Sequence, residues 1–283
     1  MPPARLELAA PGPALRQPPP GSTKPAPPLV PERLSQGMLL IGPALLLVLW
    51  ETASRIGWLS PETLTAPSQA MAAGYAMLVD GSLLPHLLAS AGRAYSGLFL
   101  GVLAGVLLAL ASGLTRTGEA LLDGLVQVKR AVPTLALIPL AIIWLGIGEP
   151  MKIFLIFTAV LVPVYINTHA ALRGIDIGHV ELAQTLGLSR AEFIRKVALP
   201  GALPGFFTGL RIAVSLCWTA LVVLELINTQ TGIGYLMNRA RDWGQTDVIV
   251  VGILIYALLG LLSDAVVRRI EARVLSYRRS LGS

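Results

Sequence analysis

The sequence predicts an all-α, polytopic membrane protein with six transmembrane helices and both termini in the cytoplasm. Composition is the first reason: of 283 residues, 54% are hydrophobic and only 13% are charged, which is unlike a soluble globular protein. The mean hydropathy of +0.69 agrees with this interpretation. The other two reasons are a series of long apolar segments and an uneven distribution of basic residues between them.

The apolar segments approach the length of about 20 residues that a helix needs to cross the hydrocarbon core. In chain order, the predicted spans are 37–53, about 86–112, about 132–147, about 151–171, 202–227 and 247–267. Pro67 and Ser68 begin a short amphipathic helix that suits the membrane surface. Residues 119–131 predict a helix at the water boundary that leads into the third span, and residues 146–150 predict a tight reversal after it.

The basic residues orient these spans, because cytoplasmic loops are enriched in Lys and Arg. With both termini inside, sixteen Lys and Arg residues lie in the cytoplasm, four lie clearly outside, and Arg93 and Arg211 lie near span ends. The sixteen are Arg5, Arg16, Lys24, Arg33, Arg116, Lys129, Arg130, Arg173, Arg190, Arg195, Lys196, Arg268, Arg269, Arg273, Arg278 and Arg279, and the four are Arg55, Lys152, Arg239 and Arg241.

The two ends of the chain differ from this membrane domain, which we place at 37–275. Residues 1–36 hold 11 of the 21 prolines and no apolar stretch, so they predict a disordered cytoplasmic tail. No cleaved signal peptide is evident in them. Residues 276–283 predict a second, short cytoplasmic tail. The single cysteine, Cys217, lies in an apolar run and is expected to be a packed core residue.

A polar, helix-forming segment at about 172–201 separates the fourth and fifth spans. Asp176 is a candidate N-cap for a first short helix, which Gly187 would end. Ser189 and Glu192 have capping-box spacing for a second short helix, and Pro200 is expected to end it. The segment therefore predicts a compact pair of helices in the cytoplasm, where it can meet a partner in water.

Glycines recur at four-residue spacing in two places: Gly97, Gly101 and Gly105, and then Gly201, Gly205 and Gly209. Such rows let helix backbones approach closely. We expect contacts within the subunit, with a dimer interface as the alternative.

Polar side chains at membrane depth are candidates for function, because they are costly there. Glu225, toward the outer end of the fifth span, is either a structural carboxylate or part of a solute pathway. As a structural group it would pair with an arginine such as Arg239 or Arg241, or with a backbone amide.

Three more residues are candidate pathway groups: Trp218 and Thr219 in the fifth span and Asn167 in the fourth. For Trp218, ordinary packing is an equal alternative. Arg93 is expected to extend its charge to the membrane surface, with attraction of an anionic solute as the alternative.

The sequence carries no recognisable catalytic or metal site. None of the four lysines follows a glycine, so the phosphate-binding pattern Gly-x-x-x-x-Gly-Lys-Ser/Thr is missing. The three histidines lack zinc-site spacing. The net charge of +6 does not indicate nucleic-acid binding, because the basic residues flank the spans instead of clustering. We therefore expect no enzyme activity and no bound metal.

The polar segment contains Glu181-Leu182-Ala183-Gln184-Thr185-Leu186-Gly187, followed after nine residues by Val197-Ala198-Leu199-Pro200. This pattern resembles the EAA loop of permease subunits of ATP-binding-cassette (ABC) importers, with conservative changes at Leu182 and Val197. In that family the loop docks on the ATPase subunit. The resemblance implies that Glu181, Ala183, Gly187, Leu199 and Pro200 form the ATPase-coupling loop.

Further segments are similar to the branch of these permeases that serves aliphatic sulfonates, taurine, nitrate and related small anions. They include 58–61, 130–140, 163–168 and 231–236. The resemblance implies a type I importer permease in the bacterial inner membrane. It also implies a second copy of the chain, two cytoplasmic ATPase subunits and an extracytoplasmic solute-binding protein as partners. No cofactor of its own is expected, because ATP would be bound by the ATPase.

Several alternatives stay open at this point. Within the same architecture, the candidate solutes are an aliphatic sulfonate, taurine, nitrate, bicarbonate or another small solute. A secondary transporter is the main alternative of another class, but it would favour several intramembrane carboxylates, and Glu225 alone lies well inside a predicted span. A membrane enzyme is disfavoured by the missing catalytic groups.

Overall fold

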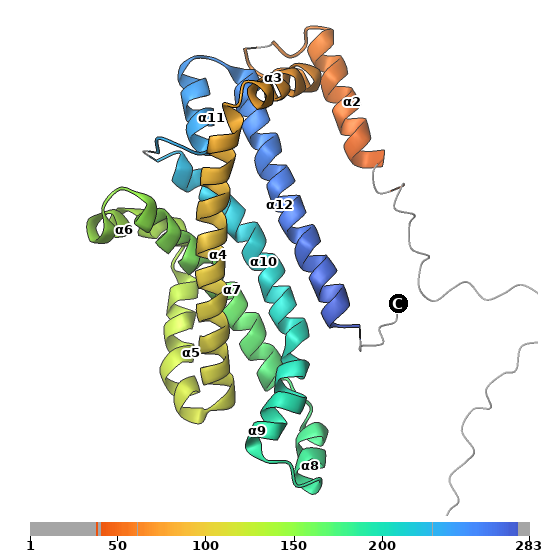
Figure 1. The fold of residues 1–283 in the computed structure, drawn as a ribbon, viewed down its shortest axis with the longest axis vertical. Helices are drawn as coiled ribbons and strands as arrows, with labels where there is room; N and C mark the ends of the chain where they lie inside the picture. The colour runs from red at the N-terminus through yellow and green to blue at the C-terminus, as the bar shows by residue number, and fades with distance from the viewer. Residues whose placement is uncertain (1–37, 39–40, 61, 228, 277–283) are drawn as a thin grey trace, which may run out of the picture. The chain divides into compact units, whose positions relative to one another are not determined.

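The computed structural model describes residue 38 and residues 41–60, 62–227 and 229–276. These residues form helices and no strand, which confirms the all-α prediction (Figure 1). The chain divides into two units, 1–46 and 47–283, and the description below concerns the second. The predicted tail at 1–36 and residues 277–283 of the C-terminal tail lie outside the described residues.

The helices in chain order are α2 (Ile41–Arg55), α3 (Pro67–Val79), α4 (Leu83–Leu114), α5 (Arg116–Ala131), the 3₁₀-helix η1 (Thr134–Leu137), α6 (Ile138–Leu145), α7 (Glu149–Arg173), α8 (Ile177–Thr185), α9 (Arg190–Phe193), the π-helix η2 (Ile194–Ala198), α10 (Leu199–Glu225), α11 (Ile233–Asp242) and α12 (Thr246–Val274).

Four of the predicted spans are confirmed as long apolar helices. They are 83–114, 149–173, 190–225 and 246–274, which correspond to the second, fourth, fifth and sixth spans. At the first predicted span, α2 has 15 residues, and residues 39–40 before it are outside the described part. The helix expected from Pro67 is present as α3. The count of six spans and the positions of the termini stay predictions.

The third predicted span differs from expectation. We expected a continuous helix over about 132–147, but this region consists of η1 and α6, bent by 92° from α5. The cause is local: Pro133 disfavours helical backbone at Val132, which has φ −89° and ψ 117°. The chain therefore leaves α5 in an extended conformation and starts a new, short helix.

Helix α4 packs against α7 through its glycine row. A Cβ on Gly97 would lie 2.5 Å from Ile156, and one on Gly101 would lie 2.6 Å from Val160. One on Gly105 would lie 2.9 Å from the carbonyl oxygen of Leu161. No side chain larger than hydrogen fits at these distances without displacement, so the backbone of α4 packs closely against α7 over about two turns.

Helix α10 packs against α7 in the same way. A Cβ on Gly205 would lie 2.4 Å from Ala171, and one on Gly209 would lie 2.7 Å from the carbonyl oxygen of Pro163. Both glycine rows therefore make the expected contacts within the subunit.

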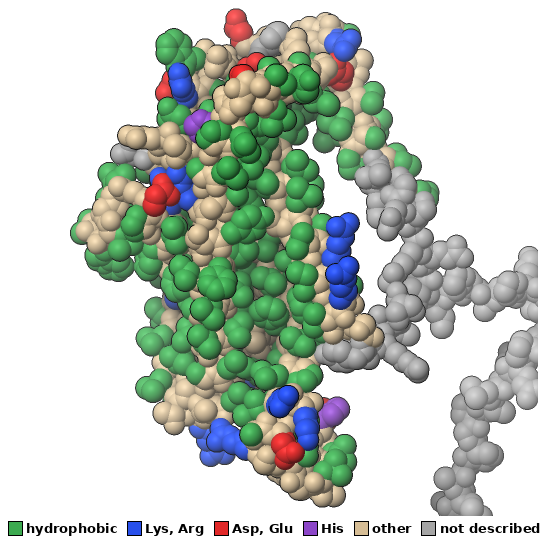
Figure 2. Space-filling model, in the orientation of Figure 1, with side chains coloured by type: hydrophobic (Ala, Val, Ile, Leu, Met, Phe, Trp, Pro, Cys, Tyr) green, Lys and Arg blue, Asp and Glu red, His purple; other side chains and the backbone are tan. Residues whose placement is uncertain are grey.

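The surface of this unit is apolar along the long helices and charged toward their ends. Figure 2 shows apolar side chains over the middle of α4 and α10, with Lys and Arg gathered near α8 and α9 and on the C-terminal half of α12. Exposed apolar residues such as Phe99 and Leu103 suit contact with lipid.

The glycine contacts predict a position-specific effect of volume in α4. Gly101→Val should lower the thermal unfolding midpoint in detergent, because overpacking of a tight contact costs about 1–3 kcal/mol. Gly92 lies in the same helix with nothing within 4 Å of an added Cβ, so Gly92→Val is the matched control. Equal midpoints for the two variants would contradict the α4–α7 packing.

Candidate functional site

The polar segment after α7 begins with α8, the helix predicted from Asp176. The carboxylate of Asp176 accepts a hydrogen bond of 2.8 Å from the backbone N–H of Gly178 at the start of this helix. Gly187 has φ +67°, the left-handed conformation that ends a helix and favours glycine. Its N–H donates to the carbonyl of Gln184 at 3.0 Å. The predicted N-cap and glycine end are both confirmed.

The second helix begins as predicted but does not end as predicted. Ser189 and Glu192 form both halves of a capping box. Pro200 was expected to end this helix, and that expectation is wrong, because the chain stays helical from 190 to 225. The reason is the π-turn η2, in which the N–H of Leu199 reaches back five residues to Ile194. This wider turn accommodates the proline ring at the start of α10, where the missing N–H is tolerated.

The predicted coupling residues occupy different environments in this segment. Glu181 is exposed on α8, whereas Ala183 is buried on its inner side. Leu199 is exposed and Pro200 half-buried in the continuous helix below. Three apolar side chains of the segment, Ile177, Leu182 and Leu186, are 57–73% exposed.

The segment is fixed to the membrane helices at its base. A guanidinium nitrogen of Arg190 donates to the carbonyl of Leu114 at 2.9 Å, and Arg173 pairs with Glu119 of α5. Below them, Leu172, Ala198 and Ala202 form a small apolar core. The exposed helix pair is therefore attached to the ends of α4, α7 and α10.

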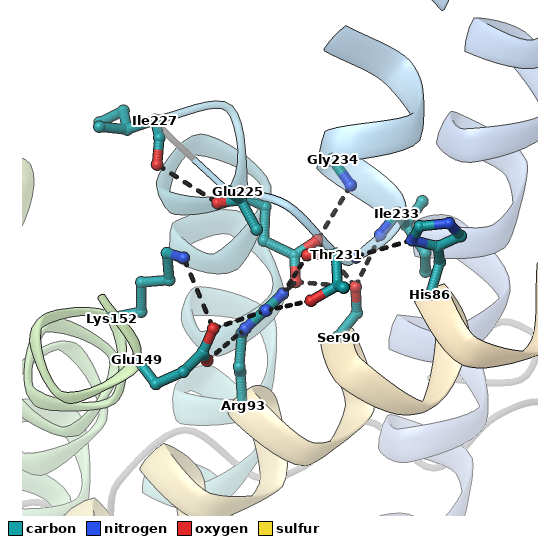
Figure 3. Close-up of polar contacts among 12 residues, drawn as sticks. His86, Ser90, Arg93, Glu149, Lys152, Glu225, Ile227, Thr231, Ile233 and Gly234 are labelled. Atoms are coloured by element: carbon teal, nitrogen blue, oxygen red, sulfur yellow. Dashed lines mark hydrogen bonds and ion pairs between the residues drawn. The ribbon is translucent and has the colours of Figure 1, made fainter. Parts of the chain in front are cut away.

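At the other end of α10, Glu225 is 1% exposed and fully bonded (Figure 3). One oxygen pairs with Arg93 at 2.6 Å, and the other accepts from the N–H of Gly234 at 2.9 Å. The hydroxyls of Ser90 and Tyr256 donate to the same carboxylate at 2.7–2.8 Å. The backbone amide was among the expected partners, but the arginine is Arg93 instead of Arg239 or Arg241.

Arg93 is the centre of this network. It is 5% exposed and forms a bidentate ion pair with Glu149, in which its Nε and one terminal nitrogen lie 2.6 and 2.7 Å from the two carboxylate oxygens. It also donates to the carbonyl and hydroxyl of Thr231 at 2.7 and 2.9 Å. The expectation that Arg93 extends to the membrane surface is wrong, because its guanidinium is buried between the buried carboxylate of Glu225 and the half-exposed carboxylate of Glu149. The network ties α4, α7 and α10 to the segment before α11.

Sequence reasoning missed Arg93 and Ser90 as partners of Glu225, and it missed Glu149 as the second carboxylate that pairs with Arg93. A signal was present for the arginine. Arg93 lies four residues before Gly97, so it continues the glycine row that faces α7. A residue on such a row faces the neighbouring helix. Extending the glycine row by one turn would therefore have predicted that Arg93 points into the protein.

The remaining pathway candidates do not come together with Glu225. Trp218 is buried, donates to Ser263 at 3.2 Å and packs its ring against Tyr95 and Tyr256. Thr219, the next residue, faces outward from α10. Asn167 lines a separate surface hollow of about 350 Å³. The structure thus places these candidates in three environments, and their roles in a pathway stay predictions.

Known proteins resemble the chain over most of its length. Residues 97–276 match the family described as "Binding-protein-dependent transport system inner membrane component". The chain belongs to this family. It is therefore a bacterial inner-membrane permease of the ABC-importer class, as the resemblance of the 181–200 segment indicated.

Individual relatives are permease proteins as well. The aliphatic sulfonates transport permease protein SsuC of Escherichia coli (strain K12) is 46% identical over 81% of this chain and 87% of its own length. The taurine transport system permease protein TauC of the same organism is 37% identical over 82% and 86%. The nitrate import permease protein NrtB of Leptolyngbya laminosa is 34% identical over 69% and 70%.

A solved structure supports the fold. The crystal structure of an amino acid ABC transporter with histidines aligns over 70% of this chain and 97% of its own, with a TM-score of 0.58 and 17% identity.

The buried network predicts that Glu225 is needed for stability. Glu225→Gln keeps the shape but removes the charge opposite Arg93, and breaking a buried ion pair costs about 3–5 kcal/mol. We expect a clearly lower thermal unfolding midpoint in detergent. Asp242→Asn, which alters an exposed carboxylate beside Arg241, is the control. A midpoint equal to that of the parent protein would contradict a structural role for Glu225.

Proposed function

We propose that this chain is the permease subunit of an ABC importer and forms the path of a small anionic organic solute, with aliphatic sulfonates as the substrates. The observation that carries the proposal is the similarity to SsuC across four fifths of the chain, together with the helix pair at 176–200. ATP is bound and hydrolysed by a separate cytoplasmic ATPase dimer, so the permease carries no cofactor of its own.

The helix pair is proposed as the contact with the ATPase. Three of its apolar side chains, Ile177, Leu182 and Leu186, are exposed on or next to α8, the helix that carries the exposed carboxylate of Glu181, and no contact among the described residues of the subunit explains their exposure. Apolar residues with a charged neighbour are typical of a docking surface. Because the helix of residues 190–225 is continuous, a push on the helix pair would be carried into the membrane through α10.

The remaining partners follow from the family. A second copy of the chain would complete the pathway, and a solute-binding protein would deliver the solute on the extracytoplasmic side. These assignments rest on the family, whose description names binding-protein-dependent transport.

Uptake by cells that express the chain with its ATPase and binding protein tests the substrate. Labelled alkanesulfonate should accumulate, and unlabelled alkanesulfonate should compete better than taurine or nitrate. Stronger competition by nitrate than by any sulfonate would contradict the proposed substrate class.

The conformation of Gly187 predicts the first coupling effect. A β-branched side chain in the left-handed region is strained by about 1–2 kcal/mol, and nothing lies within 4 Å of an added Cβ, so the backbone alone is affected. Gly187→Val should insert normally but lose solute-stimulated ATP hydrolysis and uptake together. Gly187→Asn is the control, because asparagine tolerates this conformation, and it should retain most activity. Normal uptake by Gly187→Val would contradict the coupling role.

The charge of Glu181 predicts the second effect. Glu181→Lys should reduce co-purification of the ATPase, because it reverses the charge at the centre of the proposed docking surface. Asp242→Lys makes the same change on α11, at the other end of the long helices, and should leave co-purification unchanged. If the ATPase co-purifies equally with both variants, the helix pair is not its docking site.

A further inference from the structure

One face of α10 is exposed and polar although it lies along a transmembrane helix. Thr208, Arg211, Ser215 and Thr219 recur at three- and four-residue intervals, and all four are exposed. The three hydroxyls donate to carbonyls four residues earlier in the same helix, at 2.9–3.3 Å. The helix thus satisfies these donors by itself, while the hydroxyl oxygens on this face can still accept hydrogen bonds.

Arg211, which the sequence analysis placed near a span end, lies near the middle of the continuous helix of residues 190–225. It is 15 residues from Lys196 and 14 residues from Glu225 in one continuous helix. At 1.5 Å per residue, these separations are about 22 and 21 Å. A charged side chain at such a depth is placed against protein or a water-filled path, since lipid would solvate it poorly. The polar face of α10 is therefore unsuited to contact with lipid.

A carboxylate neutralises only part of the charge on this face. Asp264 of α12 accepts from the Nε of Arg211 at 3.3 Å and pairs with Arg268 at 2.9 Å. Two guanidinium groups thus share one carboxylate, and one positive charge is left over. Arg211 is 44% exposed, and among the described residues its two terminal nitrogens make no hydrogen bond.

The same residues line a hollow in the surface. Thr208, Arg211, Ile212, Ser215 and Asp264 surround a space of about 330 Å³. Its two hydroxyls already donate within the helix and its carboxylate pairs with Arg211 and Arg268, so the groups left for a ligand are one apolar side chain and the terminal N–H donors of Arg211. A sulfonate group presents three oxygens to such donors, and a short alkyl chain can contact the isoleucine.

We propose that this hollow is a solute-contact site of the transport path, in which the guanidinium of Arg211 binds the anionic head group of the solute. Asp264 occupies the Nε of Arg211 and holds the side chain in place, leaving the terminal nitrogens for the anion. The proposal rests on the proposed function and identifies a residue that selects negative charge.

Thiol reactivity tests the site without transport. Ser215→Cys is prepared in the complete complex with the ATPase in nanodiscs, and the parent protein, whose Cys217 is 1% exposed, gives the background. Its rates with 2-sulfonatoethyl and 2-(trimethylammonio)ethyl methanethiosulfonate are each divided by the rate with a free small thiol. The anionic reagent should be favoured by about 10-fold, since a local charge concentrates its counter-ion. Adding Arg211→Gln should abolish the preference, and Arg273→Gln, an exposed arginine at the end of α12, should not.

Two results of this experiment would overturn the proposal. The first is no reaction of Ser215→Cys with either reagent, which would mean that the face is covered. The second is a preference that persists without Arg211. Discs of phosphatidylcholine and of phosphatidylglycerol separate soluble anions from lipid headgroups. Loss of the preference in phosphatidylglycerol would assign the site to lipid and would also overturn the proposal.

A charge exchange separates anion binding from a merely structural ion pair. Arg211→Gln should reduce sulfonate uptake by about 10-fold or more, as expected for loss of a charged hydrogen-bond donor. The double variant Arg211→Asp with Asp264→Arg rebuilds the ion pair but puts a negative charge on α10. It should remain as defective as Arg211→Gln, whereas restored uptake would show that only the pair matters.

Failure of the proposed function would look different from failure of this site. If sulfonate is the wrong solute, the parent complex takes up none, but the thiol preference and its loss in Arg211→Gln are unchanged.

Discussion

Backbone contact along α7 is the constraint on which the rest of this structure depends. In lipid there is little hydrophobic gain from bringing apolar helices together, so close packing must supply the stabilisation. The glycine rows of α4 and α10 allow that contact on two sides of α7. Arg93 extends one of these rows, so the same geometry that permits close packing also delivers its guanidinium to Glu149 and Glu225. Close packing of α4 and α10 on α7 therefore determines both which helices are neighbours and where the buried charges lie.

Helix α10 connects the two polar regions of the molecule. One end carries Glu225 in a fully bonded, buried network, and the other end continues through the π-turn into the exposed helix pair. A span of 36 residues, about 54 Å long at 1.5 Å per residue, joins them. We infer that the network fixes one end of this helix and that the ATPase moves the other. The exposed polar face that includes Arg211 lies between them.

Local sequence patterns were sufficient for features that depend on a few neighbouring residues. The N-cap at Asp176, the helix end at Gly187 and the capping box at Ser189 were predicted and are confirmed, because each is set by contacts within four residues. Four spans were found from length and hydropathy alone. The helix pair of the candidate site was therefore readable from the sequence.

Features that depend on distant residues were not readable in the same way. Arg93 meets Glu225 across 132 positions, and no local pattern selects it over Arg239 or Arg241. A proline usually ends a helix, but the π-turn just before Pro200 lets this helix continue. At Val132 and Pro133 a helix expected to continue is interrupted instead. The apolar run there is long enough for a span, but the proline holds the residue before it in an extended conformation. In both cases the backbone at a proline, and not the pattern of apolar side chains, determined whether the helix continued.

The central claim is that this chain moves its solute only when a separate ATPase drives it. Proteoliposomes that contain the permease with its ATPase and binding protein test this most directly, with ATP or an imposed ion gradient as the energy source. We expect alkanesulfonate uptake with ATP, no uptake with a gradient alone, and no effect of ionophores on the ATP-driven rate. Uptake driven by an ion gradient through the permease alone would contradict the claim.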